Sequence, residues 1–271
     1  IKMSASNALA CLSRDHQGTQ AAVGDAAAIA PLVVLLSGDE GLDAQQEAAG
    51  AIVALADHKP NRQAITAADG ISHLVNLLAC ENSTTRKHAE GALVRLSIEA
   101  ENRTLIIEKL VNMLRKDTTG QEQAAAALAN LARESEDNRN SIVGADGISP
   151  ILSLIDSQSG KAKENAVSAL TELCRGSMSN QNAIAAVGGI PKLVGVLLTV
   201  STGGTGNQFT KDQALIHLCT LAADAIKEMA KHNPENQSSI AETGAIAPLV
   251  SFLGAPAPEL QANSAGALAN L

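Results

Sequence analysis

One sequence motif recurs along this chain about every 42 residues. It begins Asn-x-x-x-Ile-x-x-x-Gly-Ile-x-x-Leu-Val-x-Leu-Leu, passes through a polar spacer and closes with Ala-x-Ala-Leu-x-x-Leu-Ala. The closing leucines Leu12, Leu55, Leu96, Leu131 and Leu173 lie 43, 41, 35 and 42 residues apart. Self-similarity at this period is typical of solenoids, in which each repeat packs on its neighbours and the stack offers an extended surface to a partner.

Apolar spacing within one repeat predicts three helices. In residues 57–97, we expect Asn61 to cap a short first helix and Gly70 to supply the permissive backbone for the turn after it. The second and third helices follow from helically spaced apolar residues: Ile71, Leu74, Val75 and Leu78, then Ala89, Ala92, Leu93 and Leu96. With no Trp, no Tyr and two Phe, the core must be built from aliphatic side chains, which suits closely packed helices. The sequence therefore predicts an all-α solenoid of about six three-helix repeats.

Two copies depart from the pattern. Only 35 residues separate Leu96 from Leu131, so the first two helices of that repeat are expected to be shortened or fused. An insertion at about 199–212 contains the Gly-rich stretch 199–207, TVSTGGTGN, which is expected to form a flexible loop. The long helix after it has two possible anchor pairs, Leu218/Leu221 or Ile226/Met229. Because both chain ends fall inside third helices, residues 1–271 are expected to be a single solenoid domain and a segment of a longer protein.

This repeated pattern resembles the armadillo repeat over essentially the whole chain. The resemblance implies a right-handed superhelix whose third helices line a concave groove that binds an extended peptide or a partner protein. The function expected from it is a non-catalytic protein-interaction scaffold. One alternative is the substrate-recognition region of a U-box ubiquitin ligase, with its catalytic module outside residues 1–271. An importin-alpha-like cargo adaptor is less favoured, because the family's groove tryptophans correspond here to Ala126 and Gly266.

The groove-facing positions are expected one residue, one turn and two turns before the closing leucine of each third helix. In the armadillo family, an asparagine at the position of Asn130 and Asn270 commonly grips the ligand backbone, so Asn130 is the first candidate. The full candidate set is Asn130, Arg95, Glu172, Gln123, Asn165, His88, Asn270 and Asn263. The glycines Gly50, Gly91 and Gly266 on the same helices either open the groove floor or let neighbouring helices pack closely.

No motif in the sequence indicates an enzyme. The stretch Gly203–Gly206 lacks the Lys-Ser/Thr of a phosphate-binding loop, the six histidines have no metal-ligand spacing, and GxSxG, HExxH and CxxC do not occur. We therefore expect no catalytic residues, no metal, no cofactor and no small-molecule substrate.

Charge and hydropathy limit the class of partner and the cellular compartment that we expect for this chain. The net charge of −8 without a Lys/Arg block argues against nucleic acid and weakly favours a basic or amphipathic partner segment. No apolar run approaches the ~20 residues that cross a bilayer, so no membrane span is expected. Four cysteines without CxxC pairing indicate reduced thiols packed as small apolar residues, and hence a cytoplasmic and/or nuclear location.

Overall fold

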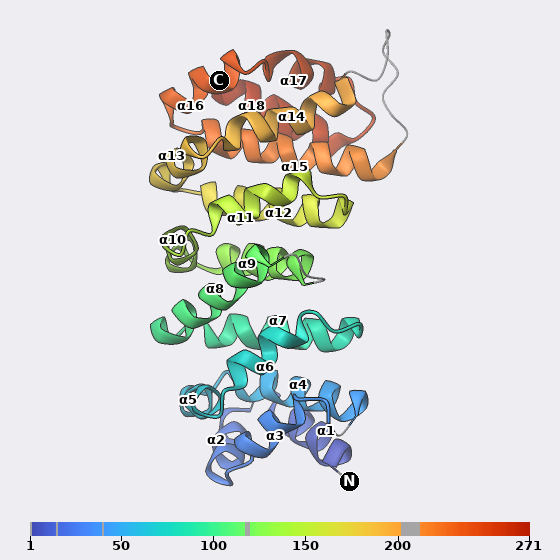
Figure 1. Cartoon of the computed structure of the whole chain (residues 1–271), viewed down its shortest axis with the longest axis vertical. Helices are drawn as coiled ribbons and strands as arrows, with labels where there is room; N and C mark the ends of the chain where they lie inside the picture. Colours follow the sequence, from blue (N-terminus) through green and yellow to red (C-terminus); the bar gives the residue numbers. More distant parts are fainter. Residues whose placement is uncertain (1, 15, 40, 117–119, 202–211) are drawn as a thin grey trace. The chain divides into compact units, whose positions relative to one another are not determined.

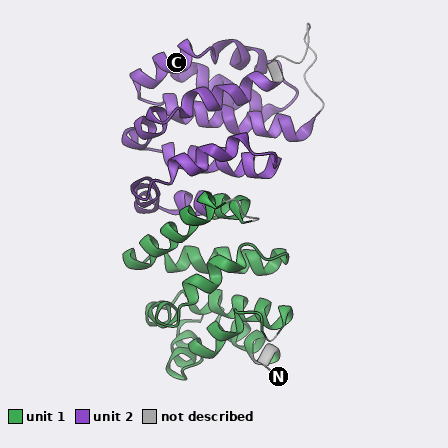
Figure 2. Cartoon of the chain, viewed as in Figure 1, with its two compact units in different colours: residues 1–127 green, residues 128–271 purple. Residues whose placement is uncertain are grey.

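The fold is an all-α solenoid. The computed structural model describes residues 2–14, 16–39, 41–116, 120–201 and 212–271, and every regular element in these ranges is a helix (Figure 1). The chain divides into two compact units, residues 1–127 and 128–271, and the division falls within helix α9 (Gln121–Glu134) (Figure 2). The handedness of the superhelix and the expectation of a single domain stay predictions.

Unit 1 contains two complete three-helix repeats after a leading third helix. Its helices are α1 (Lys2–Ser13), α2 (Gln17–Asp25), α3 (Ile29–Leu35), α4 (Leu42–Leu55), α5 (Lys59–Ala67), α6 (Gly70–Leu77), α7 (Ser83–Leu96) and α8 (Ala100–Arg115). The third helices α1, α4 and α7 pack side by side in that order. Their closing leucines Leu55 and Leu96 are fully buried, and burying one leucine side chain contributes about 1.5–3 kcal/mol.

Unit 2 repeats the same arrangement. Its helices are α10 (Glu136–Gly144), α11 (Ile148–Ser153), the 3-10 turn η1 (Leu154–Asp156), α12 (Gly160–Cys174), α13 (Met178–Ala186), α14 (Gly189–Ser201), α15 (Gln213–Ala230), α16 (Pro234–Glu242), α17 (Ile246–Phe252) and α18 (Pro258–Asn270). The third helices α12, α15 and α18 pack in sequence, each on the next.

The repeated asparagine joins the first helix of a repeat to the third helix that precedes it. Asn138, Asn180 and Asn236 are buried, and their Nδ2 atoms donate to the carbonyl oxygens of Leu131, Leu173 and Met229 at 2.8, 3.1 and 3.0 Å. These carbonyls are among the last four of their helices, which have no partner within the helix. The prediction that Asn61 caps its own helix is wrong, because the cap position is His58 and the Asn61 amide donates to Leu55 and Gln20 instead.

The residue after this asparagine donates a hydrogen bond to the next backbone carbonyl oxygen along the preceding third helix. Arg62 Nη1, Arg139 Nη1 and Gln237 Nε2 donate to the carbonyl oxygens of Ala56, Ala132 and Ala230 at 3.1, 3.1 and 3.0 Å. Arg62 also pairs with Glu99 at 2.8 Å. The hydrogen bond from Arg62 lowers the pKa of the Glu99 carboxyl below its ordinary value of 4.5.

The turn between the first and second helices differs from its prediction. Asp69, not Gly70, takes the left-handed conformation, with φ of 60°, and Asp146 does the same at 56°. Gly70 begins α6, where an added Cβ would lie 2.8 Å from the carbonyl oxygen of Ile65. This glycine is therefore required for close approach of the two helices rather than for backbone freedom.

The 35-residue repeat contains one straight helix in place of two. Helix α8 runs without a break for 16 residues and packs against α6, which confirms the predicted fusion. Five of its apolar residues, Ile106, Ile107, Leu110, Val111 and Leu114, are buried.

The structure describes the start of the predicted insertion and the helix that follows it. Residues 199–201 form the last turn of α14, so the loop prediction is wrong there, and residues 202–211 lie outside the described part. Asn236 bonds to Met229 just as Asn180 bonds to Leu173, which makes Ile226/Met229 the anchor pair of α15.

Within the described ranges, no helix on its own is long and apolar enough to cross a bilayer. Two strongly bent pairs, α2 with α3 and α13 with residues 189–199, meet the length and composition criteria only when joined.

Candidate partner-binding surface on the third helices

Unit 2 carries a continuous line of polar contacts across its third helices. Arg133 at the end of α9 donates from Nε to Glu172 Oε1 on α12 at 3.1 Å and from Nη1 to Asn130 Oδ1 at 3.3 Å. The other Glu172 oxygen accepts from Arg175 Nε at 3.0 Å. Glu172 thus holds two guanidinium groups at fixed positions, one from its own helix end and one from the neighbouring helix.

The line continues onto α15 and α18. Arg175 Nη2 lies 3.3 Å from Asp224 Oδ2, and Asp224 Oδ1 pairs with Lys227 Nζ at 2.5 Å. Lys227 in turn donates to Asn263 Oδ1 at 3.2 Å. We call this set the third-helix ladder; its members are Asn130, Arg133, Glu172, Arg175, Asp224, Lys227 and Asn263.

Exposure along the ladder is uneven and decides which charge faces solvent. The side chains of Arg133 and Arg175 are 55% and 47% exposed, whereas Glu172 is only 9% exposed and Asp224 19%. The sequence places Glu172 on the exposed face, which is wrong, because the two arginines cover it. The groups presented outward are therefore mostly cationic, in contrast to the acidic chain as a whole.

The two predicted asparagines of α18 already bond to the neighbouring helix. Asn263 Nδ2 donates to the carbonyl oxygen of Thr220 at 3.2 Å, and Asn270 Nδ2 donates to that of Lys227 at 3.0 Å. Each amide keeps one further donor hydrogen, while the oxygen of Asn263 already accepts from Lys227. Asn165, on α12, is half-buried.

Unit 1 holds the remaining candidates. Arg95 donates to Asp57 Oδ1 at 2.8 Å and to the carbonyl oxygen of its own helix residue Gly91 at 3.1 Å. The His88 ring lies 3.4 Å from the carbonyl oxygen of Gln46 on α4. Gln123 has a buried Oε1 for which the described residues provide no hydrogen-bond partner. Among the described residues of unit 1, these three candidates share no hydrogen bond with one another.

Two of the three predicted third-helix glycines, Gly50 and Gly266, lie close to a side chain of the adjacent third helix. A Cβ at Gly50 would lie 3.2 Å from the His88 ring, and one at Gly266 would lie 2.7 Å from Lys227 Cδ. At Gly91 the contacts would be ordinary, with Val53 at 3.7 Å. The side chain of the adjacent third helix fills the space at the first two glycines.

Sequence reasoning missed Arg133, Arg175, Asp224 and Lys227. A signal for the arginines exists, because a basic residue follows the closing apolar residue by two positions at Arg14, Arg133, Arg175 and Lys231. The α15 residues could not be assigned, since the register of that helix was open.

Reactive and metal-binding chemistry has little support in the described ranges. No group of three or more His, Cys, Asp or Glu side chains comes together there. Burial raises the pKa of the Cys174 thiol and raises that of Cys219 to about 12, so neither is a ready nucleophile. The prediction of packed thiols is confirmed for these two and wrong for Cys11, which is exposed.

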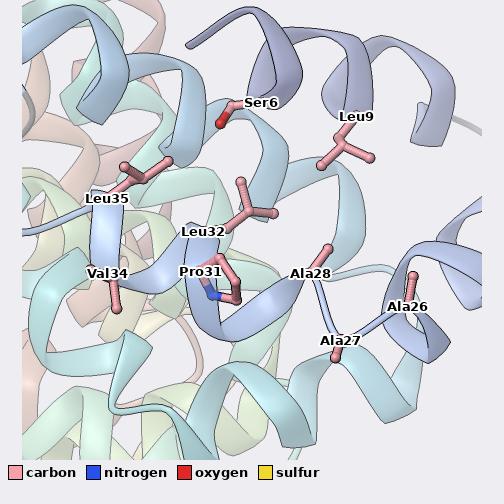
Figure 3. Close-up of a pocket in the computed structure, with 9 residues that line it drawn as sticks. All are labelled: Ser6, Leu9, Ala26, Ala27, Ala28, Pro31, Leu32, Val34 and Leu35. Carbon is pink, nitrogen blue, oxygen red and sulfur yellow. The ribbon is translucent and has the colours of Figure 1, made fainter. Parts of the chain in front are cut away.

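Unit 1 also contains an apolar pocket of about 420 Å³ between α1 and the α2–α3 segment (Figure 3). Leu9, Pro31, Leu32 and Leu35 line it, and Ser6 supplies a hydroxyl. None of its lining residues is titratable, so this pocket offers shape and apolar surface but no acid–base chemistry.

Comparison with known proteins identifies two repeats in unit 2. A family model for the armadillo/beta-catenin-like repeat matches residues 135–175 and 233–271, which are the α10–α12 and α16–α18 repeats. The human armadillo repeat-containing protein 3 is 32% identical over 121 residues, a match that covers 43% of this chain and 14% of that protein.

Solved structures agree on the fold. An engineered protein with 29% sequence identity superimposes with a TM-score of 0.66 over 99% of this chain and 64% of its own. A designed armadillo repeat protein, 23% identical, gives 0.64 over 90% and 99% of the two chains, and another, solved in complex with the peptide (KR)4, is 22% identical and gives 0.66 over 89% and 98%. Residues 135–175 and 233–271 therefore match armadillo repeats, and the fold of the described chain is similar to that of designed armadillo-repeat proteins.

Proposed function

We propose that this chain is a non-catalytic scaffold that binds an extended segment of a partner protein across the third helices of unit 2. The observation that carries the proposal is the third-helix ladder, an unbroken series of polar contacts from Asn130 to Asn263. Its members are held by one another, so their rotamers are ordered before a partner arrives, which lowers the entropic cost of binding.

The designed armadillo protein that binds (KR)4 supports peptide binding as a use of this fold. The charge preference of the present chain differs from that example, because Arg133 and Arg175 are about half exposed while Glu172 is covered. We infer that the bound segment places acidic or neutral polar side chains over these guanidinium groups. Nucleic acid and small molecules are not proposed as partners, and a cytoplasmic or nuclear location remains part of the proposal.

The U-box ligase alternative gives residues 1–271 the same binding role and differs only in a catalytic module elsewhere. The importin-alpha-like alternative requires aromatic stacking on basic stems, which a chain without Trp or Tyr cannot supply at the ladder.

The proposal is tested by selecting peptides from a displayed random library on the whole chain and measuring their affinities by fluorescence anisotropy. Arg133→Ala and Arg175→Ala are used singly, because each leaves Glu172 with one arginine partner. We expect each to weaken binding about tenfold or more. Asn140→Ala, an exposed change on the first helix of the same repeat, is the control. Equal affinities for all these variants would move the binding surface away from the ladder.

A further inference from the structure

The straight helix of the short repeat leaves a cleft of about 510 Å³ between α6 and α8 in unit 1. The residues that carry the argument are Val75 and Asn76 from α6, Lys109, Asn112 and Met113 from α8, and Lys116 directly after the end of α8. We call this site the α6–α8 cleft. Its walls belong to unit 1, whereas the third-helix ladder belongs to unit 2.

We propose that the α6–α8 cleft binds a short acidic segment of a partner protein, with two carboxylates three residues apart and an apolar residue between them. The first reason is charge. Lys109 and Lys116 stand on the same wall, and in the described part of the chain neither forms an ion pair. Two uncompensated ammonium groups in one cleft of an acidic protein attract an anionic partner.

A third cation lies next to this wall but does not line the cleft. Arg115 precedes Lys116, and its Nη1 lies 3.4 Å from Oδ1 of Asn112, a residue that lines the cleft. On the opposite wall, Ser72 also lines the cleft, and its hydroxyl donates to Asp69 Oδ1. That carboxylate belongs to the start of α6 and accepts a hydrogen bond already, so the cationic side of the cleft is α8.

The second reason is spacing. Lys109 lies in α8 and Lys116 is the residue directly after its end, seven positions along the chain, which separates their Cα atoms by about 10.5 Å along the helix axis at ~1.5 Å per residue. A polyproline-type segment advances ~3.1 Å per residue with three residues per turn, so acidic side chains at i and i+3 share one side about 9 Å apart. The two lysines therefore match an acid-x-x-acid segment in this conformation.

The third reason is the floor between the lysines. Met113 is half-buried and Val75 is buried, and together they offer an apolar contact for the residue between the two acids. Asn76 and Asn112 are exposed amides that can donate to and accept from an extended backbone. The cleft thus provides two cations for the two acids, an apolar contact for the residue between them, and amides that can bond to the peptide backbone.

The test uses two fluorescein-labelled peptides on the whole chain, one with the core Glu-Pro-Leu-Glu and one with Lys-Pro-Leu-Lys, at low salt. We expect the acidic peptide to bind saturably and the basic one not to bind. The double variant Lys109→Glu/Lys116→Glu should bind the acidic peptide about tenfold or more weakly, while the matched reversal Lys161→Glu/Lys231→Glu should stay within about twofold of wild type.

A second readout locates the bound peptide without any charge change. The chain has four methionines, so ¹³C-methyl-methionine labelling gives a small set of signals, and Met113→Leu assigns the relevant one. We expect the Met113 methyl signal to shift on titration with the acidic peptide and those of Met178 and Met229, both in unit 2, to stay in place. No saturable binding, equal loss in both double variants, or a Met113 signal that does not move would each overturn the proposal.

Discussion

The buried asparagine near the start of a first helix should make a measurable contribution to stability through its hydrogen bond to one carbonyl oxygen of the preceding third helix. In Asn180→Ala, the 3.1 Å hydrogen bond to the Leu173 carbonyl oxygen is lost while that carbonyl stays buried at the end of α12. A buried acceptor left without its donor costs about 1–3 kcal/mol. For a protein of this size, about 2 kcal/mol corresponds to a fall in melting temperature of about 4–8 °C.

A matched control separates this effect from helix propensity. Asn140 also lies in a first helix, α10, but is exposed, so Asn140→Ala changes the same residue type without removing a buried contact. Its free energy of unfolding should stay within about 0.5 kcal/mol of wild type. Asn180→Asp should be worse than Asn180→Ala, because it places a carboxylate against the Leu173 carbonyl without a donor.

The assay is urea unfolding followed by circular dichroism, with thermal unfolding as a second measure. Equal stabilities for Asn180→Ala and Asn140→Ala would refute the reasoning. An Asn180→Asp variant as stable as wild type would do so too, since it would show that the amide donor is not needed.

Three further outcomes are expected. Gly189→Ala should destabilise the protein by about 1–3 kcal/mol, because its Cβ would lie 2.7 Å from a backbone oxygen, while Gly195→Ala in the same helix, with nothing within 4 Å, should be neutral or stabilising by up to about 1 kcal/mol. Glu99→Gln should destabilise the protein at pH 7, and the difference should shrink as pH falls below 4.5, because the Arg62 hydrogen bond depresses the folded pKa of Glu99 and that stability is lost on protonation. Cys219 should resist a thiol reagent at pH 8 until the chain is unfolded, since its pKa is raised to about 12.

Each of these three predictions would be contradicted by one specific result. Equal unfolding free energies for the two glycine variants would show that the Gly189 contact relaxes without cost. A Glu99→Gln effect that is constant from pH 7 down to pH 3 would exclude a role for the carboxylate charge. Rapid native labelling of Cys219, identified by peptide mapping, would show that its burial is transient.

Much of the fold follows from the sequence because the signals are local. The apolar spacing within each helix and the recurrence of the closing leucine predict the helices and their order. The loss of residues between Asn102 and Val111 removes the turn that would break α8, so the fusion is also readable from the chain. In these cases the determining residues lie within one or two helical turns of one another.

Glycine and asparagine show where local reasoning fails. Gly70 is needed against Ile65, while Asp69 takes the left-handed conformation, so a residue typical of turns is present for packing instead. Asn61 has the chemistry of a cap but reaches the preceding third helix. Both roles depend on which backbone atoms lie nearby in space.

The sequence by itself determined the repeat and the helical class, and it led to the hypothesis that the third helices bind a partner. The tertiary structure decided the register of α15, the covering of Glu172 by Arg133 and Arg175, and the cleft beside α8. The physical reason is distance along the chain. Arg133 and Glu172 are 39 residues apart, and only the packing of neighbouring repeats brings their side chains together.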